Sequence, residues 1–249
     1  KKSLKARLDE LRIEAEISVR EGAKHLILSD KGVNEKNASI PMVLAIGAIN
    51  SKLSDLGIRG FTSINVQTSE ALDTHSFAVL LGVGATTINP YIAFDSIYQR
   101  YEKKLFGKIT FEECIKRYVK SVDNGLLKIM SKMGISVLSS YRGGCNFEAV
   151  GLSRSVVAEY FPGMTSRISG IGIAGIEKKI KELHKNAFQK NVSILPIGGL
   201  YKYRKNGELH QYQAQLIHIL QNAVEKNSYE SYKKYAEGIY SLPIINLRD

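Results

Sequence analysis

Hydrophobic positions divide the first hundred residues into alternating helical and extended segments. Apolar residues recur at helical spacing in four segments, which predicts helices at 4–21, 40–56, 74–81 and 91–100. Between them, short apolar runs predict strands at 25–30, 61–66 and 86–89. Strands that alternate with helices are typical of βα units and a parallel sheet. The pattern therefore predicts an α/β fold in which alternating βα units form a partial, barrel-like parallel sheet.

A charged segment at 103–123 carries an apolar stripe that predicts further helix. Gly107 and Thr110 divide this segment, and the sequence TFEE at 110–113 has the pattern of a capping box. The stripe leads directly into the next stretch.

The stretch GLLKIMSKMGISVLSSYRGG at 125–144 is predicted to be a helix, a strand and a loop in that order. Apolar residues at helical spacing run to Met133, and Gly134 supplies a helix stop. The run 135–138 predicts a short buried strand, followed by a polar, flexible loop at 139–144. A loop at the carboxyl end of a strand is where α/β proteins place ligands or docking surfaces.

After this loop, 147–149 and 153–160 are predicted to be short helices, the second with Ser153 as its N-cap. The glycine-rich sequence SGIGIAG at 169–175 resembles a dinucleotide fingerprint. No clear strand precedes it, the glycine spacing differs, and no acidic residue stands about 20 positions later on a second strand. We interpret it as a glycine-rich entry to a helix at 176–188.

The last fifty residues are predicted to form a β-hairpin followed by two helices. The runs 201–205 and 208–212 flank Asn206-Gly207, a strong hairpin signal. Helices are expected at 215–224 and 229–240. We place a boundary near Pro196, which gives two domains, 1–195 and 196–249.

Composition adds few constraints. The chain has 249 residues, a formal charge of +11 and two cysteines, and its lysines are spread along the whole sequence. A solvated, lysine-rich surface is favoured over a nucleic-acid interface because no aromatic residues interleave with a basic cluster. No apolar run approaches the roughly 20 residues needed to span a bilayer, and the first residues lack the apolar core and the small-residue cleavage site of a signal peptide. Two distant cysteines indicate a reducing cytoplasm. The chain begins without Met, so we expect a piece of something longer.

Candidate chemistry is sparse. We interpret His25, His75 and His184 as structural, and no histidine spacing typical of a metal site occurs. The polar loops at 67–70 and 89–91 follow strands as flavin phosphate loops do, but Glu70 would repel a phosphate and Pro90 has no N–H to donate. We therefore predict no catalytic, cofactor-binding or metal-binding residue in this chain.

The sequence resembles the large subunit of the glutamate synthase family. The resemblance begins with MSKMGIS followed by SYRG in the central stretch. It extends in one order through LILSDK (26–31), INPYIAFDSI (88–97), FEAVGL (147–152), TSRISGIG (165–172) and GGLYKYRKNGELH (198–210). Matching blocks over nearly the whole chain are more specific than any single motif.

The resemblance implies a place in a large enzyme. Glutamate synthases transfer ammonia, released from glutamine in an amidotransferase domain, to 2-oxoglutarate in a flavin domain, where FMN reduces the product with electrons from an iron–sulfur cluster. Residues 1–195 would be the second half of the cofactor-free central domain, and 196–249 the entry to the FMN domain. The piece would be a scaffold and part of the ammonia-tunnel wall, inactive alone.

The same resemblance implies the partners. They would be the amidotransferase and FMN domains of the same chain, with a small electron-donor subunit or ferredoxin as electron source. FMN and the iron–sulfur cluster would lie outside this piece, because three cysteine ligands cannot come from Cys114 and Cys145.

Within that setting, we expect four residues around the 139–144 loop to contact a neighbouring domain: Lys132, Ser139, Tyr141 and Arg142. Tyr and Arg are common interface anchors, and the glycine pair after them allows close backbone approach. The alternative is an internal brace in which Arg142 pairs with Glu148. Two other functions stay open: a free-standing flavin- or phosphate-binding barrel enzyme and a basic nucleic-acid-binding module.

Overall fold

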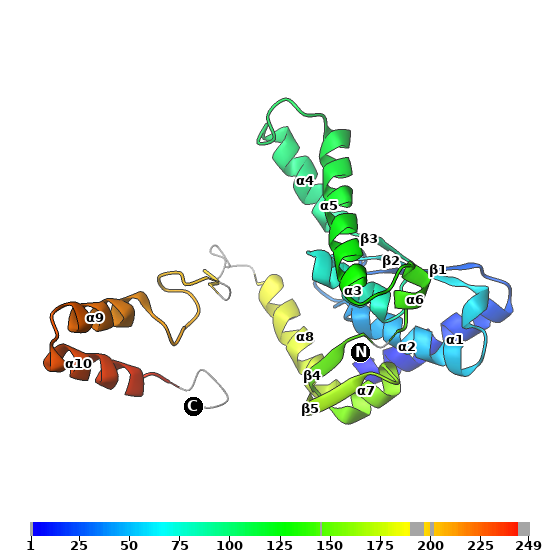
Figure 1. Cartoon of the computed structure of the whole chain (residues 1–249). Helices are drawn as coiled ribbons and strands as arrows, with labels where there is room; N and C mark the ends of the chain where they lie inside the picture. Colours follow the sequence, from blue (N-terminus) through cyan, green and yellow to red (C-terminus); the bar gives the residue numbers. More distant parts are fainter. Residues whose placement is uncertain (1, 145, 190–196, 200–201, 244–249) are drawn as a thin grey trace. The chain divides into compact units, whose positions relative to one another are not determined.

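A computed structural model describes residues 2–144, 146–189, 197–199 and 202–243 (Figure 1). The chain forms two compact units, Lys1–Phe188 and Gln189–Asp249. The domain boundary predicted near Pro196 lies outside the described residues and stays a prediction.

The first unit is built on a three-stranded parallel sheet whose strands follow their order in the sequence. The strands are β1 (His25–Ser29), β2 (Ser63–Gln67) and β3 (Thr87–Asn89). The helices around them are α1 (Leu4–Arg20), α2 (Met42–Asp55), α3 (Thr74–Gly82) and α4 (Tyr91–Glu102), with a 3₁₀ turn at Arg59–Phe61. These βα units confirm the predicted α/β class. The sheet is partial and does not close into a barrel.

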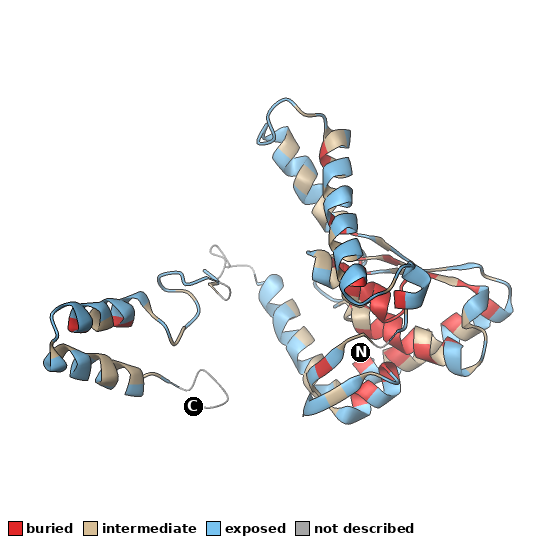
Figure 2. Ribbon diagram, viewed as in Figure 1, coloured by how far each residue is buried: buried red, intermediate tan, exposed pale blue. Residues whose placement is uncertain are grey.

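The core lies on one face of this sheet. Side chains alternate along each strand, so that Ile64 and Val66 are buried and Leu26, Leu28 and Ile88 pack beside them. Helix α2 contributes many core residues, since nine of its fourteen residues are buried. Figure 2 shows these buried residues gathered around α2 and the sheet. The opposite face of the sheet is not covered by described residues, and its Ile27 side chain is 73% exposed.

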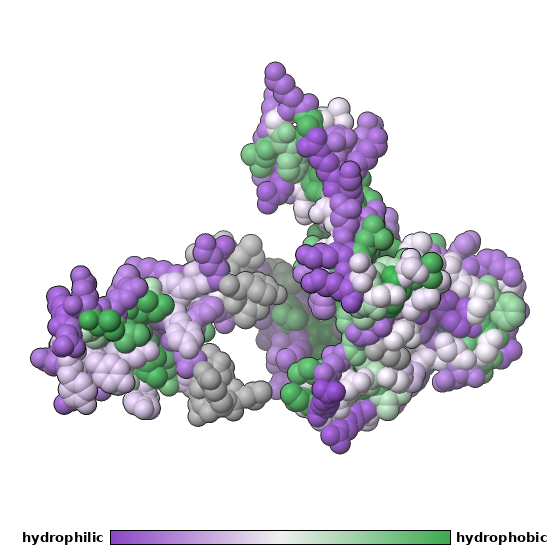
Figure 3. Space-filling model, viewed as in Figure 1, coloured by the Kyte–Doolittle hydropathy of each residue, from purple (hydrophilic) through white to green (hydrophobic). Residues whose placement is uncertain are grey.

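Helix α5 (Phe111–Lys132) is one continuous helix of 22 residues. It begins where the capping pattern predicted, since Thr110 Oγ1 accepts a hydrogen bond from Glu113 N at 3.3 Å. With α4 it forms an antiparallel hairpin that projects from the sheet (Figure 1). Leu105 and Phe106, in the turn between the two helices, are exposed. Figure 3 shows hydrophobic patches among the hydrophilic residues of this projecting hairpin.

The strand predicted at 135–138 is wrong. Gly134, at φ +71°, ends α5, and the Ile135 amide donates back to the Met130 carbonyl at 2.9 Å. This backbone closure is a Schellman motif, and it uses the amide that a strand would need. A short helix, α6 (Leu138–Tyr141), follows in place of the predicted loop start.

A second parallel pair then forms from β4 (Glu148–Leu152) and β5 (Thr165–Ile171), with an irregular register. Two predictions are corrected here: the helix expected at 147–149 is largely strand β4, and a strand does precede the glycine-rich sequence. Helix α7 (Arg154–Tyr160) begins at its predicted cap, Ser153, and α8 (Ile173–Ala187) follows β5.

The second unit contains α9 (Ala214–Glu225) and α10 (Tyr229–Tyr240), both close to their predicted bounds. The Asn206-Gly207 turn is present, with Gly207 N donating to Arg204 O at 2.9 Å and Asn206 at φ +62°. The predicted β-hairpin is not, since the described residues between 202 and 212 include no strand. Glu208 N donates instead to Gly198 O at 2.7 Å. Across the described residues, no helix combines the length and apolarity that crossing a membrane requires.

Candidate functional site

The four candidate contact residues differ in exposure. Lys132 lies in the last turn of α5 and Ser139 in α6, and both are exposed. Tyr141 is only 1% exposed, and Arg142 is half-buried. The structure therefore brings the four residues to one region, but it does not present an exposed Tyr141–Arg142 pair.

Tyr141 anchors the loop to its own unit. Its ring packs with Ala78 and Leu81 of α3 and Met130 of α5, and it meets the Phe147 ring edge-on at a centroid distance of 6.3 Å. Burial raises the pKa of the Tyr141 hydroxyl above its usual value. The large aromatic side chain expected to anchor an interface thus fixes the position of the loop from within.

Arg142 binds a hydroxyl group rather than the carboxylate of Glu148. Its Nη1 donates to Thr86 Oγ1 at 3.1 Å, and the same oxygen accepts from Ile64 N at 3.1 Å. The Glu148 carboxylate lies 3.7 Å from Arg167 Nε. The Glu148 pairing is wrong, and Arg142 links the loop to the amino ends of β2 and β3.

A second arginine, which sequence reasoning missed, stands beside Arg142. Arg59 donates three hydrogen bonds: Nε to Asn50 Oδ1 at 2.7 Å, Nη1 to Thr62 O at 2.7 Å and Nη2 to Gly84 O at 2.8 Å. Burial, followed by the positive charge of Arg142, lowers the pKa of Arg59 below its usual value. No local pattern marks Arg59, because its partners come from three separate segments.

The carboxyl ends of the strands carry a different polar cluster, centred on Asp30. Its Oδ2 accepts hydrogen bonds from Thr68 Oγ1 at 2.8 Å, Ser69 N at 2.8 Å and Ser69 Oγ at 3.0 Å. Glu70 N donates to Thr68 Oγ1 at 3.0 Å. Two amides of the 67–70 loop are therefore already bound within the protein.

Glu70 itself accepts a hydrogen bond from Met42 N, at the start of α2, at 2.8 Å. Burial raises the pKa of this carboxyl group, and the nearby Asp30 charge raises it further, against the lowering effect of the Met42 bond. A negative charge next to a helix N-terminus is favourable. Glu70 thus occupies the position that an anion would take at α2.

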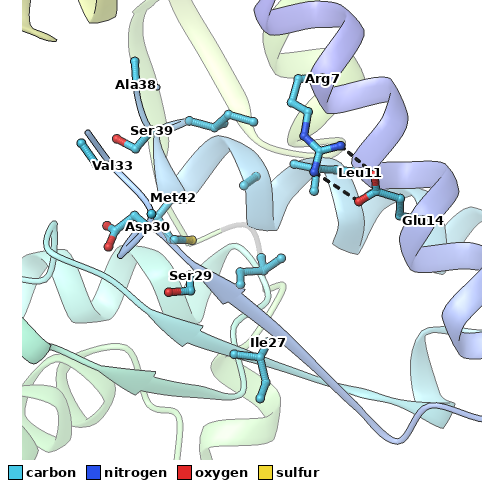
Figure 4. A pocket seen from close by; sticks show the side chains of 14 residues that line it. Arg7, Leu11, Glu14, Ile27, Ser29, Asp30, Val33, Ala38, Ser39 and Met42 are labelled. Atoms are coloured by element: carbon cyan, nitrogen blue, oxygen red, sulfur yellow. Dashed lines mark hydrogen bonds and ion pairs between the residues drawn. The ribbon is translucent and has the colours of Figure 1, made fainter. Parts of the chain in front are cut away.

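A cavity of about 410 Å³ lies between α1, the end of β1 and the segment before α2 (Figure 4). Arg7 and Glu14 of α1 line it, with Arg7 Nη1 2.6 Å from Glu14 Oε1. The Arg7–Glu14 ion pair offsets the charge of these two side chains, and the Asp30 carboxylate at the end of β1 also lines the cavity. Most of the other labelled side chains are small or apolar.

The uncovered face of the sheet is a network of uncharged polar side chains. His25 Nδ1 lies 2.7 Å from Ser63 Oγ, and Ser29 Oγ donates to Gln67 Oε1 at 2.8 Å. Asn65 joins the strands, since its Nδ2 donates to Ser63 Oγ and its Oδ1 accepts from Thr87 Oγ1 at 2.7 Å. The strand residues on this face include no Lys, Arg, Asp or Glu: His25, Ile27, Ser29, Ser63, Asn65, Gln67, Thr87 and Asn89.

The two other histidines interpreted as structural, His75 and His184, both contact other parts of the first unit. His75 meets the Phe147 ring at a centroid distance of 6.1 Å, and His184 Nε2 lies 3.1 Å from Glu35 O. In the described part of the chain, no three or more His, Cys, Asp or Glu side chains are grouped to hold a metal ion. The expected lack of cofactor and metal sites stays a prediction.

The short parallel sheet, its covering helices and the connecting loops define the chain as an α/β protein. Comparison with known proteins identifies it further. The sequence model of the family "Glutamate synthase central domain" matches residues 1–153, and the chain belongs to this family.

Several large enzymes are similar over nearly the whole chain. The glutamate synthase (NADPH) large chain of Azospirillum brasilense is 52% identical over 247 residues, which cover 99% of this chain and 16% of that protein. The corresponding large chain of Bacillus subtilis is 39% identical, with coverage of 93% and 15%. The chloroplastic ferredoxin-dependent glutamate synthase of Spinacia oleracea is 36% identical, with coverage of 99% and 16%. The chain thus spans about a sixth of the length of these relatives.

Proposed function

We propose that this chain is the scaffold segment of a glutamate synthase large subunit. In the complete enzyme, glutamine, 2-oxoglutarate and reductant give two glutamate molecules. Residues 1–195 hold the amidotransferase domain and the FMN domain in place and form part of the ammonia-tunnel wall. Residues 196–249 begin the FMN domain.

The observation that carries this proposal is the uncovered, uncharged face of the β1–β2–β3 sheet. Parallel sheets are normally covered on both faces, and charged residues are depleted from the cores of protein interfaces. A chain with 35 Lys and Arg and 24 Asp and Glu residues places none of them on this face. Both features support the proposal that another part of the polypeptide covers this face.

The polar network on that face also suits a tunnel wall. Hydroxyl and amide groups that already bind one another hold no charge that would trap ammonium. The one histidine on this face, His25, forms a hydrogen bond with Ser63.

The cofactors and partners belong to the rest of the enzyme in this proposal. FMN and the iron–sulfur cluster lie outside the 249 residues, and electrons come from a small subunit or from ferredoxin. The engaged amides of the 67–70 loop and the position of Glu70 support the view that no flavin phosphate binds here. The scarcity of cysteines supports a reducing, cytoplasmic setting.

The loop region keeps its proposed interdomain role in a modified form. Lys132 and Ser139 are exposed and available to a neighbouring domain. Tyr141 contributes by holding the loop in position, and Arg142 through the half-buried guanidinium next to Arg59.

The open face is tested by placing a charge on it. Thr87 is exposed on β3, so Thr87→Lys is expected to leave the melting temperature of the 249-residue chain nearly unchanged. In the complete synthase, the same substitution buries a charge without a partner. Glutamate formed per glutamine hydrolysed is then expected to fall. Gln99→Lys, on the exposed side of α4, is the matched control. Unchanged coupling and stability in the Thr87→Lys synthase would contradict the proposal.

The free-standing flavin enzyme is tested directly by titrating the 249-residue chain with FMN and following flavin fluorescence. No saturable quenching is expected, because Ser69 N donates to Asp30 and Glu70 stands near the α2 terminus. Saturable quenching at micromolar FMN would overturn the scaffold assignment in favour of the flavin enzyme.

A further inference from the structure

Two arginines, from segments more than eighty residues apart, line one cavity at the amino ends of β2 and β3. The cavity has a volume of about 470 Å³, and Arg59 and Arg142 both face it. Its other lining residues are uncharged: Asn50, Ser54, Gly60, Thr62 and Gly143. We propose that this cavity is a carboxylate-binding site in which the guanidinium groups of Arg59 and Arg142 hold the anion.

The first argument is that the two positive charges are held together without a carboxylate in the cavity wall. Charged side chains that are largely removed from water are usually paired. The hydrogen bonds of Arg59 go to an amide oxygen and two backbone carbonyls, and Arg142 Nη1 donates to the hydroxyl group of Thr86. All four of these partners are neutral, so none of these contacts offsets the repulsion between the two guanidinium groups.

The second argument is that the protein fixes both side chains in advance. Three hydrogen bonds hold Arg59, and Thr86 holds Arg142, while the buried Tyr141 ring fixes the loop that carries it. Gly143 N also donates to Gly82 O at 2.9 Å, which ties the loop to α3. A preorganised pair of cations loses little entropy when it binds an anion.

The third argument concerns the kind of anion. Guanidinium groups match the planar oxygens of a carboxylate, and such bonds are stronger than neutral ones. The Asn50 amide and the Ser54 and Thr62 hydroxyls add small polar groups to the wall. Such a site suits the polar end of a carboxylate better than a large apolar ligand.

The carboxylate has two sources: a free small molecule, or an Asp or Glu side chain from another part of the synthase polypeptide. The chemistry of recognition is the same for both. The site in the 249-residue chain is independent of the proposed scaffold role. Only the distinction between the sources uses the complete enzyme.

The first experiment titrates the 249-residue chain with sodium acetate and disodium succinate, against sodium chloride at equal ionic strength. Arginine Nε–H resonances and the melting temperature are recorded. The carboxylates are expected to shift two arginine signals saturably and to raise the melting temperature more than chloride does. Arg142→Gln is expected to weaken carboxylate binding by about 10-fold or more, the usual weight of a hydrogen bond to a charged group.

Two further variants keep this test decisive. Arg100→Gln removes a positive charge from the exposed side of α4 and is expected to leave binding unchanged. Arg59→Lys keeps the charge but loses the planar fork, so it is expected to bind carboxylate more weakly. Arg59 makes three structural hydrogen bonds, so Arg59→Lys could fail to fold. In that case the carboxylate binding of Arg142→Gln still tests the proposed site. Equal responses to carboxylate and chloride, or unchanged binding by Arg142→Gln, would overturn the site.

The second experiment identifies the source. If the complete synthase binds acetate or succinate as the 249-residue chain does, the site takes a free small carboxylate. If the complete synthase shows no response, but Arg142→Gln lowers its melting temperature more than Arg100→Gln does, an acidic side chain of the polypeptide occupies the site. A synthase with neither response would contradict both sources.

Discussion

The two parallel sheets of the first unit have similar local structure but very different burial. In the β1–β2–β3 sheet, Ile64 is fully buried beneath the helices. In the β4–β5 pair, Ile168 is 52% exposed, and Val150 and Ile171 are also exposed. Both sheets consist of parallel strands connected through helices. Backbone hydrogen bonding between neighbours is enough to define the strands of both sheets. How much each sheet stabilises the fold depends on the helices that pack against it and bury its side chains.

The largest expected effect compares equivalent isoleucines. Ile64→Ala is expected to lower the free energy of unfolding by about 2–5 kcal/mol, because it opens a cavity in the core. Ile168→Ala should cost about 1 kcal/mol or less, since half of that side chain is already in water. Urea denaturation of both variants measures the difference. Similar losses would show that the β4–β5 pair is a second core of equal weight.

The next effect tests how closely the two regions are joined. Gly47 of α2 faces the end of α7, where an added Cβ would meet the Phe161 ring and lie 2.6 Å from Tyr160 O. Gly47→Ala is expected to cost about 1–3 kcal/mol by overpacking.

Gly175→Ala in α8 is the matched control, because its Cβ would meet only Ile171, at 3.0 Å. Ala favours helix over Gly by about 1 kcal/mol, which offsets this mild contact. A smaller loss of stability in Gly47→Ala than in Gly175→Ala would mean that α2 and α7 separate readily. Thermal melts of both variants settle the order.

A third comparison uses the helix caps of the two regions. Asp73 Oδ1 accepts from Ser76 N at 2.8 Å at the start of α3, and Ser153 Oγ accepts from Val156 N at 3.3 Å at the start of α7. Replacing either residue by Ala is expected to cost about 1 kcal/mol at neutral pH. Only the Asp73 cap should depend on pH.

The sign follows from the bonds to Ser76, which lower the pKa of Asp73 in the folded protein. Its contribution is therefore complete above the unfolded pKa of about 3.9 and is lost as the pH falls through the folded value. Unfolding free energies from pH 2 to 7 give the measurement, with Asp73→Asn as a variant that keeps a neutral cap. A pH-independent cost for Asp73→Ala would disprove the ionised cap.

The smallest expected effect lies at the polar edge of the first sheet. The pKa of Glu70 is raised on folding, so its ionisation destabilises the fold as the pH rises above the ordinary value of 4.5. Glu70→Gln should match the parent chain at pH 3.5 and be slightly more stable at pH 7, because the amide oxygen still accepts from Met42 N. Denaturation at the two pH values measures this. Lower stability of the variant at pH 7 would show that the charge at the α2 terminus outweighs its burial.

Hydrophobic periodicity predicted the first three strands and their helices within two residues, since each repeats over a full element. It failed where backbone bonds decide the structure. The apolar run from Ile135 forms no strand because its amide closes α5. The Asn206-Gly207 turn forms, but the described residues on either side of it form no strands. An Asn-Gly pair predicts the turn itself and does not ensure that the flanking segments pair with each other. The short FEAVGL segment is ambiguous in periodicity, and only its partner β5 makes it a strand.

The candidate site shows the same division. The sequence pointed to the 139–144 loop because of its composition, but it did not reveal that Tyr141 turns inward onto α3 and α5. It gave no sign of Arg59, whose partners lie at positions 50, 62 and 84. Such contacts depend on the packing of segments that are distant in the chain.

The sequential order of the β1–β2–β3 sheet has a consequence for how the chain acquires its structure. Its strand contacts close loops of 38 and 22 residues, whereas the hydrogen bond from Leu4 N to Glu177 closes one of 173. By chain statistics the longest closure costs about 2 kcal/mol more than the shortest. During synthesis, which proceeds from the amino end, the sheet can assemble while α8 has yet to be made. The hydrogen bond between the first turn of α1 and Glu177 can therefore form only after residue 177 has been made.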